Sequence, residues 1–401
     1  MEVMEGSSAI GTAEAEPAQG EEAVRALAVH LPQFHPIPEN DAWWGKGFTE
    51  WRNVAKGKQL FDWQYQPHMP ADLGFYDLRL PEVRAEQAAM AAAYGISGFM
   101  YYHYWFTGKP LLERPVRDML ALGEPDFPFC VCWANENWTR AWDGKDREML
   151  LEQHYSEEDD LAHLRYLLPV LSDPRYIRVD GKPLLAVYRP DELPEPKATA
   201  ERWRREAEAA GLGGLFLVGA EGHEGNVGDP EALYGFDARY QFPPAWQNPT
   251  GPTGRGRLRS RWRSRWAMRL GLMNRSYREN LVQDYRAYAR CCAGADPADY
   301  LRFPGVMVGF DNSPRRVGKQ ATIFKDNTPE AYRVWLERAV EQASRLPAGK
   351  RFVVINAWNE WAEGNHLEPD AEHGHAYLEA TRAVMSAASR GRGLSGRVSG
   401  G

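Results

Sequence analysis

Eight short apolar runs constrain the fold of this chain more than any other feature of its sequence. Most of the runs are continuously apolar rather than alternating, which is typical of parallel strands buried on both faces. Helical patterns fall between several of them, over residues 81–94, 156–171, 198–210 and 328–346. This repeated strand–helix order predicts an α/β fold, a single (β/α)8 TIM barrel. The expected strands are Arg25–Leu31, Ile96–Tyr104, Phe127–Ala134, Pro183–Tyr188, Leu215–Ala220, Phe236–Phe242, Gly305–Asp311 and Phe352–Trp358.

A doubly wound open sheet is the alternative architecture for such a pattern. It would need a glycine-rich turn after the first strand, but residues 31–36 read LPQFHP and cannot cradle a pyrophosphate. The barrel is therefore favoured, and we expect it to span residues 24–386. An acidic, disordered segment is expected over residues 1–23, and a flexible tail over 387–401.

Two loop insertions, after strands 1 and 6, depart from a minimal barrel. Residues 38–73 are rich in Trp, Gly and Tyr and are expected to wall a pocket. Residues 249–274 are sharply basic in an otherwise acidic chain. They read either as a mobile solvated loop or as a peripheral contact with anionic glycan or a membrane surface, with Trp262 and Trp266 as interfacial anchors. The basic residues are Arg255, Arg257, Arg259, Arg261, Arg263, Arg265 and Arg269.

Composition and charge exclude several other classes of protein. The net charge of −7 argues against a dedicated nucleic-acid binder. No run approaches the roughly 18 apolar residues that a membrane-spanning helix needs, and the acidic N-terminus shows no signal-peptide pattern. The cysteines, Cys130, Cys132, Cys291 and Cys292, lack zinc-type spacing. We therefore expect a cytoplasmic protein with reduced cysteines.

Polar and aromatic residues gather just after the expected strands, where a barrel places its active site. Amides and carboxylates bind pairs of hydroxyl groups, and aromatic rings cover the faces of sugars, so the pattern predicts a pocket for a polyhydroxylated ligand. The candidate binding residues are His30, Gln33, His35, Trp44, Glu50, Trp51, Tyr102, His103, Trp105, Trp133, Asn135, Glu136, Asn137, Trp138, Glu221, Tyr240, Asp311, Asn359 and Trp361.

Metal and nucleophile sites find little support, and no cofactor is predicted. His30, His35, His103 and His366 lack HExxH or paired spacing, and hydrogen bonding is the more common role of such residues.

No GxSxG elbow is present either, which leaves pairs of carboxylates and the glycosyl chemistry they support. Two pairings compete. Glu136 could face Glu360 across the barrel mouth, or Glu360 and Glu363 could share one loop and separate each other's pKa values.

Five segments carry a resemblance to a known family. They are AVHLPQFHPIPENDAWWGKGFTEW, QPHMPADLGFYDLR, GISGFMYYHYWF, CVCWANENWTRAWDG and INAWNEWAEGNHLEPD. With them the chain, from about Ala26 to Val384, resembles the glycoside hydrolase family 99-like, or WbsX-like, proteins of bacterial polysaccharide and O-antigen gene sets. The resemblance implies a (β/α)8 barrel. It also implies retaining cleavage of internal α-mannosidic linkages, with Glu360 and Glu363 as the catalytic pair.

The resemblance further implies a route through a 1,2-anhydro sugar. The residue aligned with Glu360 takes the proton of the sugar 2-hydroxyl, which attacks C1. The residue aligned with Glu363 protonates the leaving oxygen and then activates water. This geometry suits α-mannosides and α-rhamnosides, so we expect a retaining endo-acting glycoside hydrolase of bacterial surface polysaccharide.

The alternative is a polysaccharide (O-antigen, lipopolysaccharide or capsule) biosynthesis protein, acting as a glycosyltransferase or a glycan-binding partner, because the N-terminal segments are those of the WbsX-like branch. A transferase usually carries a DxD-type metal motif. The nearest acidic run, residues 157–160, sits at an expected helix start, where acids suit the helix dipole.

Overall fold

The computed structural model describes residues 23–140, 145–222, 230–245, 275–295, 297–316 and 320–390. The basic insertion predicted at 249–274 lies outside these ranges, as do residues 1–22 and 391–401. The last described helix, α11, ends at Ser389, so the chain is helical into the segment that was predicted as a tail.

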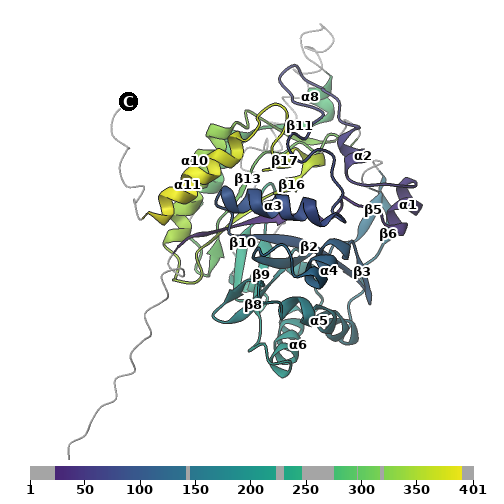
Figure 1. Cartoon of the computed structure of the whole chain (residues 1–401), viewed down its shortest axis with the longest axis vertical. Coiled ribbons are helices and arrows are strands. Elements are labelled where there is room, and N and C mark those ends of the chain that lie inside the picture. Colours follow the sequence, from purple (N-terminus) through teal and green to yellow (C-terminus); the bar gives the residue numbers. More distant parts are fainter. Residues whose placement is uncertain are drawn as a thin grey trace, which may run out of the picture.

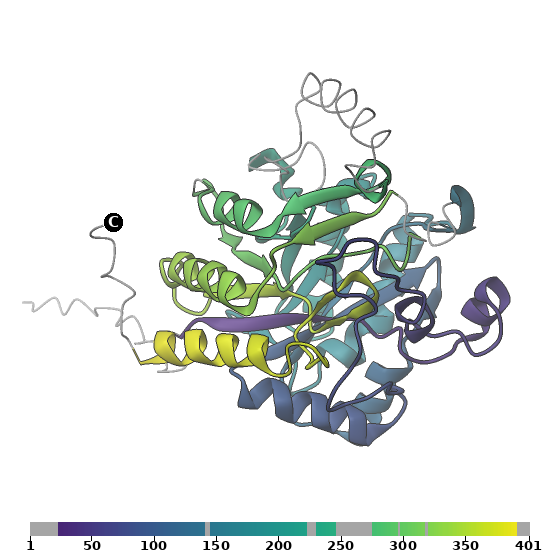
Figure 2. The same cartoon turned by 90° about the horizontal axis from the view of Figure 1, so that it is seen from above.

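The sheet confirms the predicted barrel. The strands of its main path are all parallel and follow the order β12–β10–β9–β8–β4–β2–β1–β15–β13, with helices around the outside (Figures 1 and 2). The eight predicted runs all supply strands to it. The bounds are β1 (Arg25–His30), β2 (Gly98–Phe106), β4 (Phe129–Trp133), β8 (Lys182–Val187), β9 (Phe216–Glu221), β10 (Ala238–Gln241), β12 (Arg302–Phe303), β13 (Gly305–Met307) and β15 (Phe352–Asn356).

The barrel closes through a strand that is broken by a proline. β12 pairs with β10, whereas β13 pairs with β15 on the other side. Between them stands Pro304, which has no N–H to donate to a ladder. Its carbonyl accepts a hydrogen bond from the Val354 amide at 3.0 Å. The two short strands therefore act as one seventh strand that bridges the ends of the sheet.

The large helices cover the sheet and begin at recognisable signals. Ser156, Asp284 and Thr328 cap α5, α9 and α10 by accepting a backbone N–H of the first turn. The acidic run at 157–160 forms the first turn of α5, and two of its carboxylates bind Arg202. The helices are α3 (Pro81–Ala93), α4 (Arg114–Leu122), α5 (Glu157–Leu171), α6 (Pro196–Ala209), α9 (Tyr285–Ala293), α10 (Pro329–Ser344) and α11 (Ala376–Ser389).

Smaller elements build the loops that connect the barrel strands and the helices. The eighth loop folds into a tight hairpin of β16 (Asn359–Glu360), η4 (Trp361–Glu363) and β17 (Asn365–His366). The other elements are α1 (Pro38–Trp44), α2 (Trp51–Val54), β3 (Lys109–Leu111), β5 (Trp138–Arg140), β6 (Lys145–Leu151), β7 (Arg178–Val179), η2 (Pro190–Glu192), η3 (Pro230–Leu233), α8 (Ser276–Glu279), β11 (Leu281–Asp284) and β14 (Thr322–Lys325). No helix among the described residues is both long enough and apolar enough to span a bilayer.

The first loop is joined to the eighth loop by its backbone. Pro70 forms an isolated antiparallel bridge with Asp370, and the Ala71 amide donates to the Pro369 carbonyl at 3.0 Å. A buried pair of imidazoles continues the seam, with His68 Nδ1 at 2.8 Å from His366 Nε2. In Figure 2 the purple first loop accordingly lies against the yellow eighth loop. The insertion that was expected to wall a pocket is therefore fixed to the segment that carries Glu360 and Glu363.

Candidate active site

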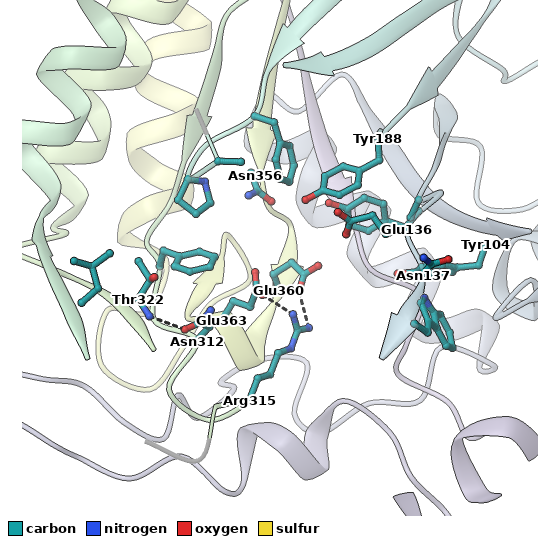
Figure 3. Close-up of a pocket in the computed structure, with 18 of the residues that line it drawn as sticks. Tyr104, Glu136, Asn137, Tyr188, Asn312, Arg315, Thr322, Asn356, Glu360 and Glu363 are labelled. Atoms are coloured by element: carbon teal, nitrogen blue, oxygen red, sulfur yellow. Dashed lines mark hydrogen bonds and ion pairs between the residues drawn. The ribbon is translucent and has the colours of Figure 1, made fainter. Parts of the chain in front are cut away.

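A cavity of about 480 Å³ lies at the carboxyl ends of the barrel strands. Aromatic and amide side chains form about half of its walls, and Glu360 and Glu363 line it together (Figure 3). Its lining residues are Tyr102, Tyr104, Ala134, Glu136, Asn137, Trp138, Tyr188, Phe242, Pro244, Ala245, Leu281, Gln283, Phe310, Asn312, Arg315, Thr322, Asn356, Glu360 and Glu363.

A second cavity of about 270 Å³ adjoins the first. It extends toward the first loop, where Gln33, Asn40 and Trp44 line it. Six residues line both cavities: Tyr104, Glu136, Asn137, Trp138, Arg315 and Glu360. The two spaces are therefore lobes of one site, and Glu360 and Arg315 stand where the lobes meet.

The eighth loop brings Glu360 and Glu363 to one guanidinium group. Arg315 donates from Nη2 to Glu360 Oε2 at 2.9 Å and from Nη1 to Glu363 Oε1 at 2.7 Å (Figure 3). Glu360 ends β16 and Glu363 lies in the single turn of η4, so the turn places both carboxylates on the cavity side. The pairing within one loop is thus present as a geometric unit.

Arg315 was missing from the predicted site. It lies in the turn that follows β13, and its Nε donates to Glu50 Oε1 at 2.7 Å. The Glu50 side chain is fully buried and lines neither lobe. Arg315 therefore stands between the catalytic candidates and a carboxylate behind them.

Burial governs the electrostatics of this cluster. It raises the pKa of Glu360 to about 8; Arg315 opposes the shift, and the charges of Glu363 and Glu50 add to it. Burial also raises the pKa of Glu50, against the opposing effect of Arg315. The raised pKa favours the protonated form of Glu360 near neutral pH, while Glu360 Oε2 and Glu363 Oε1 both accept hydrogen bonds from Arg315.

Glu136 lies on the wall opposite the pair (Figure 3). It accepts a hydrogen bond from Arg189 Nη1 at 2.9 Å, and its side chain is 46% exposed. Beside it the Trp138 ring stands edge-on to Tyr104 at 5.1 Å between ring centroids. Asn137 Oδ1 accepts a hydrogen bond from the backbone N–H of Gln153 at 2.7 Å, which fixes the position of this side-chain oxygen. The predicted residues Glu136, Asn137 and Trp138 therefore do share the cavity with Glu360.

Strand alternation separates the residues predicted on β2. Tyr102 lines the cavity, as does Tyr104, which was not among the candidate binding residues. His103 and Trp105 point the other way, toward α5: His103 Nε2 lies 2.9 Å from His163 Nε2, and the Trp105 indole donates to Asp159 at 3.1 Å. Successive strand residues face opposite sides, so neither of these two lines the site.

Several other candidates lie behind the cavity, where they hold backbone segments in place. Asn359 bridges to both backbone groups of Leu31, and Asn135 donates to the Arg189 carbonyl at 2.7 Å. The Trp51 indole donates to the Tyr76 carbonyl at 2.7 Å.

The remaining candidates are likewise buried among protein groups and absent from the lining of both lobes. They are His30, His35, Trp133, Glu221, Tyr240, Asp311 and Trp361. Polar side chains at strand ends thus divide into cavity groups and supporting groups, and sequence alone does not separate them.

The sequence contains a weak indication of several lining residues that are not among the candidate binding residues. Tyr188 and Phe242 are the last residues of two predicted strands, where a barrel exposes side chains to its mouth. Asn312 directly follows the candidate residue Asp311, and Asn356 is the first residue of the NAWNEW segment. Arg315 had no comparable signal, because it stands in an ordinary turn sequence, SPRR.

Among the described residues, one group has metal-ligand chemistry: His68, His366 and Asp370. His366 Nδ1 lies 2.9 Å from the Glu368 carbonyl and its Nε2 2.8 Å from His68 Nδ1. Asp370 accepts two backbone amides through Oδ1, from Glu372 and His373. These groups satisfy one another by hydrogen bonds, as the loop seam requires. The four histidines considered from sequence do not come together, since His30 bonds to Gln87 and His103 to His163.

Comparison with known proteins adds a family and a fold. Residues 26–381 match the family model described as glycosyltransferase WbsX. The protein WxcX from two strains of Xanthomonas campestris pv. campestris is 46% and 47% identical over 363 residues, which cover 90% of this chain and 50% of WxcX. The chain thus spans about half the length of the curated relatives it matches.

Solved structures share the barrel. A GH99 endo-alpha-mannosidase from Bacteroides thetaiotaomicron superposes with a TM-score of 0.54 at 15% identity, covering 92% of this chain and 98% of the enzyme. A glycoside hydrolase-like protein gives 0.53 at 14% identity, with 94% and 97% coverage. At such identities the likeness establishes the fold.

Proposed function

This chain belongs to the WbsX family, and on that premise we propose that it is a carbohydrate-active enzyme that cleaves glycosidic bonds. The substrate would lie in the cavity, between the pair of Glu360 and Glu363 on one side and the opposite wall on the other. One observation carries the proposal. Two carboxylates share a guanidinium on one side of an aromatic-walled cavity, at the strand ends of a barrel. A structural ion pair would not need to line a cavity of about 480 Å³.

The two lobes support an endo-acting enzyme. Glu360 lines both of them, so a chain of sugars has room on either side of the reacting bond. Rings of Tyr104, Tyr188 and Trp138 offer faces for sugars, while Asn137 and Asn312 offer amides for hydroxyl groups.

We propose the α-manno and α-rhamno configurations as substrates and a 1,2-anhydro sugar as intermediate. Glu360 accepts the proton of the 2-hydroxyl as O2 attacks C1, and the bond from C1 to the leaving oxygen breaks while Glu363 donates a proton to that oxygen. Glu363 then takes a proton from the water that opens the three-membered ring, and Glu360 returns its proton to O2. Two inversions at C1 give net retention. A carboxylate with a raised pKa is a stronger base, which suits Glu360 to a weakly acidic hydroxyl.

A role in polysaccharide biosynthesis is the second candidate, favoured by the description of the WbsX family as a glycosyltransferase family. Such an enzyme needs an activated sugar donor. The acidic run at 157–160 does not offer a donor site, because Glu157 and Asp160 bind Arg202 and Asp159 accepts from Trp105.

Product analysis separates the two candidates. Purified protein is incubated with bacterial surface polysaccharides that contain α-mannose or α-rhamnose, and new reducing ends are sought by mass spectrometry. We expect internal cleavage by the wild type and none by a Glu360→Gln, Glu363→Gln double variant. Cleavage by that variant would exclude the pair. Chain growth that depends on a nucleotide sugar, without new reducing ends, would instead support biosynthesis.

A further inference from the structure

The guanidinium of Arg315 binds three carboxylates with three different nitrogens. Nε donates to Glu50 and Nη1 to Glu363, each at 2.7 Å, and Nη2 donates to Glu360 at 2.9 Å. The Arg315 side chain is 12% exposed and that of Glu50 is 0% exposed. Because a guanidinium is planar, fixing one edge of it fixes the directions of its other N–H groups.

Glu50 is itself held on both sides. Its Oε1 accepts from Arg315, and its Oε2 accepts from Asn53 Nδ2 at 3.3 Å. Its backbone amide donates to the Gln33 carbonyl at 3.0 Å, at the start of α2. Such a carboxylate has little freedom, so it can act as a fixed anchor for the arginine.

The turn that carries Arg315 is also fixed. The Arg315 amide donates to the Asn312 carbonyl at 3.1 Å, and Asn312 Oδ1 accepts from the Thr322 amide at 2.9 Å. Asp311, just before the turn, accepts from Gln64 Nε2 at 2.6 Å. The arginine thus reaches the catalytic pair from a turn that is tied to β14 and to the first loop.

We propose that Glu50 and Arg315 form a positioning device for the catalytic pair, in which Glu50 orients the guanidinium and the guanidinium holds Glu360 and Glu363 beside each other. The inference rests on the proposed function of the two glutamates. It gives Glu50 a different role from the substrate-binding role that its sequence position predicts. Glu50 works through Arg315, because it lines neither lobe.

The proposed positioning role requires both the charge and the planar shape of the arginine. One guanidinium faces three carboxylates, and removing a member of a buried ion network leaves another charge uncompensated. Lysine at 315 would keep the charge but lose the planar fork. The charged and titratable groups around Glu360 are Arg315, Glu50, Glu363, Tyr102, Tyr104 and Glu136.

The first test does not depend on catalysis. The pKa of the Glu360 carboxyl is measured by NMR titration of ¹³C-labelled glutamate, with its signal assigned through Glu360→Gln. Glu50→Gln removes a charge that raises this pKa and should lower it, whereas Arg315→Met removes the charge that opposes the rise and should raise it further. Glu330→Gln, on the exposed surface of α10, is the matched control and should leave it unchanged. An unchanged titration in both site variants would overturn the inference.

The second test uses kinetics on a substrate found through product analysis. Glu50→Gln should lower kcat by about 10²-fold, the cost of misplacing reacting groups by about 1 Å, while KM stays within about twofold. Arg315→Lys should not restore the lost kcat. A raised KM with unchanged kcat would make Glu50 a substrate-binding residue. A lower Tm with unchanged kcat and Glu360 titration would make it purely structural; either result would reject the device. If the wild type cleaves nothing, the proposed function fails, while the NMR titration still decides whether the device exists.

Discussion

Arg315, which lines the cavity, and Arg189, which binds Glu136 of the opposite wall but lines neither lobe, each bind three acidic side chains in different settings. Arg315 binds Glu50, Glu360 and Glu363, whose side chains are 0%, 8% and 21% exposed. Arg189 binds Glu136, Asp191 and Glu192, whose side chains are 46%, 22% and 49% exposed. The same chemical arrangement is therefore buried on one wall and open to water on the other.

Burial, rather than the number of ion pairs, distinguishes the wall of Glu360 and Glu363 from the wall of Glu136. Water screens exposed ion pairs, so such pairs contribute little to stability; on this wall the burial that raises the pKa of Glu136 is opposed by Arg189. Burial penalises the charged form, and Glu360 accordingly retains a proton near neutral pH. We infer that the Arg315 wall carries the chemistry and that the Arg189 wall positions the substrate.

The largest effect should come from the buried wall. Glu360→Gln and Glu363→Gln should each lose about 10²–10⁴-fold in activity, the usual contribution of an acid or base. On an aryl glycoside with an activated leaving group, Glu363→Gln should recover much of its rate, because that group departs without a proton. Glu360→Gln should stay inactive, since the attack by O2 is lost. Initial rates on both substrates measure this contrast; equal recovery of the two variants would reject the assigned roles.

A 2-deoxy substrate tests the attacking group independently. It lacks the hydroxyl that Glu360 is proposed to deprotonate, so it should bind without turning over. Turnover at an ordinary rate would rule out the anhydro sugar and would restore Glu136 with Glu360 as the competing pair.

The next largest effect is expected in the pH dependence of kcat/KM, which should depend on Glu360 and not on Glu136. As a base, Glu360 must be ionised, so kcat/KM should rise with pH up to about 8, the raised pKa of its carboxyl. If Glu360 were the proton donor, kcat/KM should instead fall as the pH passes that value. A kcat/KM profile from pH 5 to 9 distinguishes the role of base from the role of proton donor. In Glu136→Gln, kcat/KM should rise over the same pH range as in the wild type.

A smaller effect is expected from the exposed wall. Glu136→Gln and Arg189→Met should raise KM less than about 10-fold with kcat nearly unchanged. Glu136 lines both lobes and Arg189 holds it in place, so each change weakens binding shared by ground and transition states. Steady-state kinetics on the natural polymer measure the split. Abolished turnover in Glu136→Gln would contradict the division between the walls.

Stability should also depend on pH through buried carboxyls. Glu368, behind the eighth loop, accepts from Tyr76, Gln87 and Trp361, and its burial raises its pKa to about 7. Above the unfolded pKa of about 4.3 the folded state holds protons that the unfolded state has released. The free energy of unfolding should therefore fall as pH rises from about 4.3 toward 8. Urea unfolding at several pH values measures the slope, and Glu368→Gln should flatten it; an unaltered slope would contradict this.

The barrel and the loop of Glu360 and Glu363 could be predicted from the sequence because both depend on local pattern. Parallel strands appear as continuous apolar runs, and Glu360 and Glu363 stand at a strand end surrounded by Trp and Asn. Whether a strand-end residue faces the cavity depends on the strand's register, which the sequence pattern does not give: of two neighbouring candidates, Tyr102 lines the cavity and His103 faces α5. Arg315 depends on tertiary contacts alone: its three partners come from segments 45 to 265 residues away.

The seam between the first and eighth loops has a consequence for how such a barrel can change during evolution or engineering. Barrel loops can usually be exchanged one at a time, since each grows from a separate strand. Here the first loop supplies Glu50, which binds Arg315, and is joined to the hairpin of Glu360 and Glu363 through His68 and Pro70. A graft that replaces the first loop would therefore also disturb the two proposed catalytic carboxylates. New substrate preferences should therefore arise on the opposite wall, around Tyr188 and Phe242, which belong to other loops.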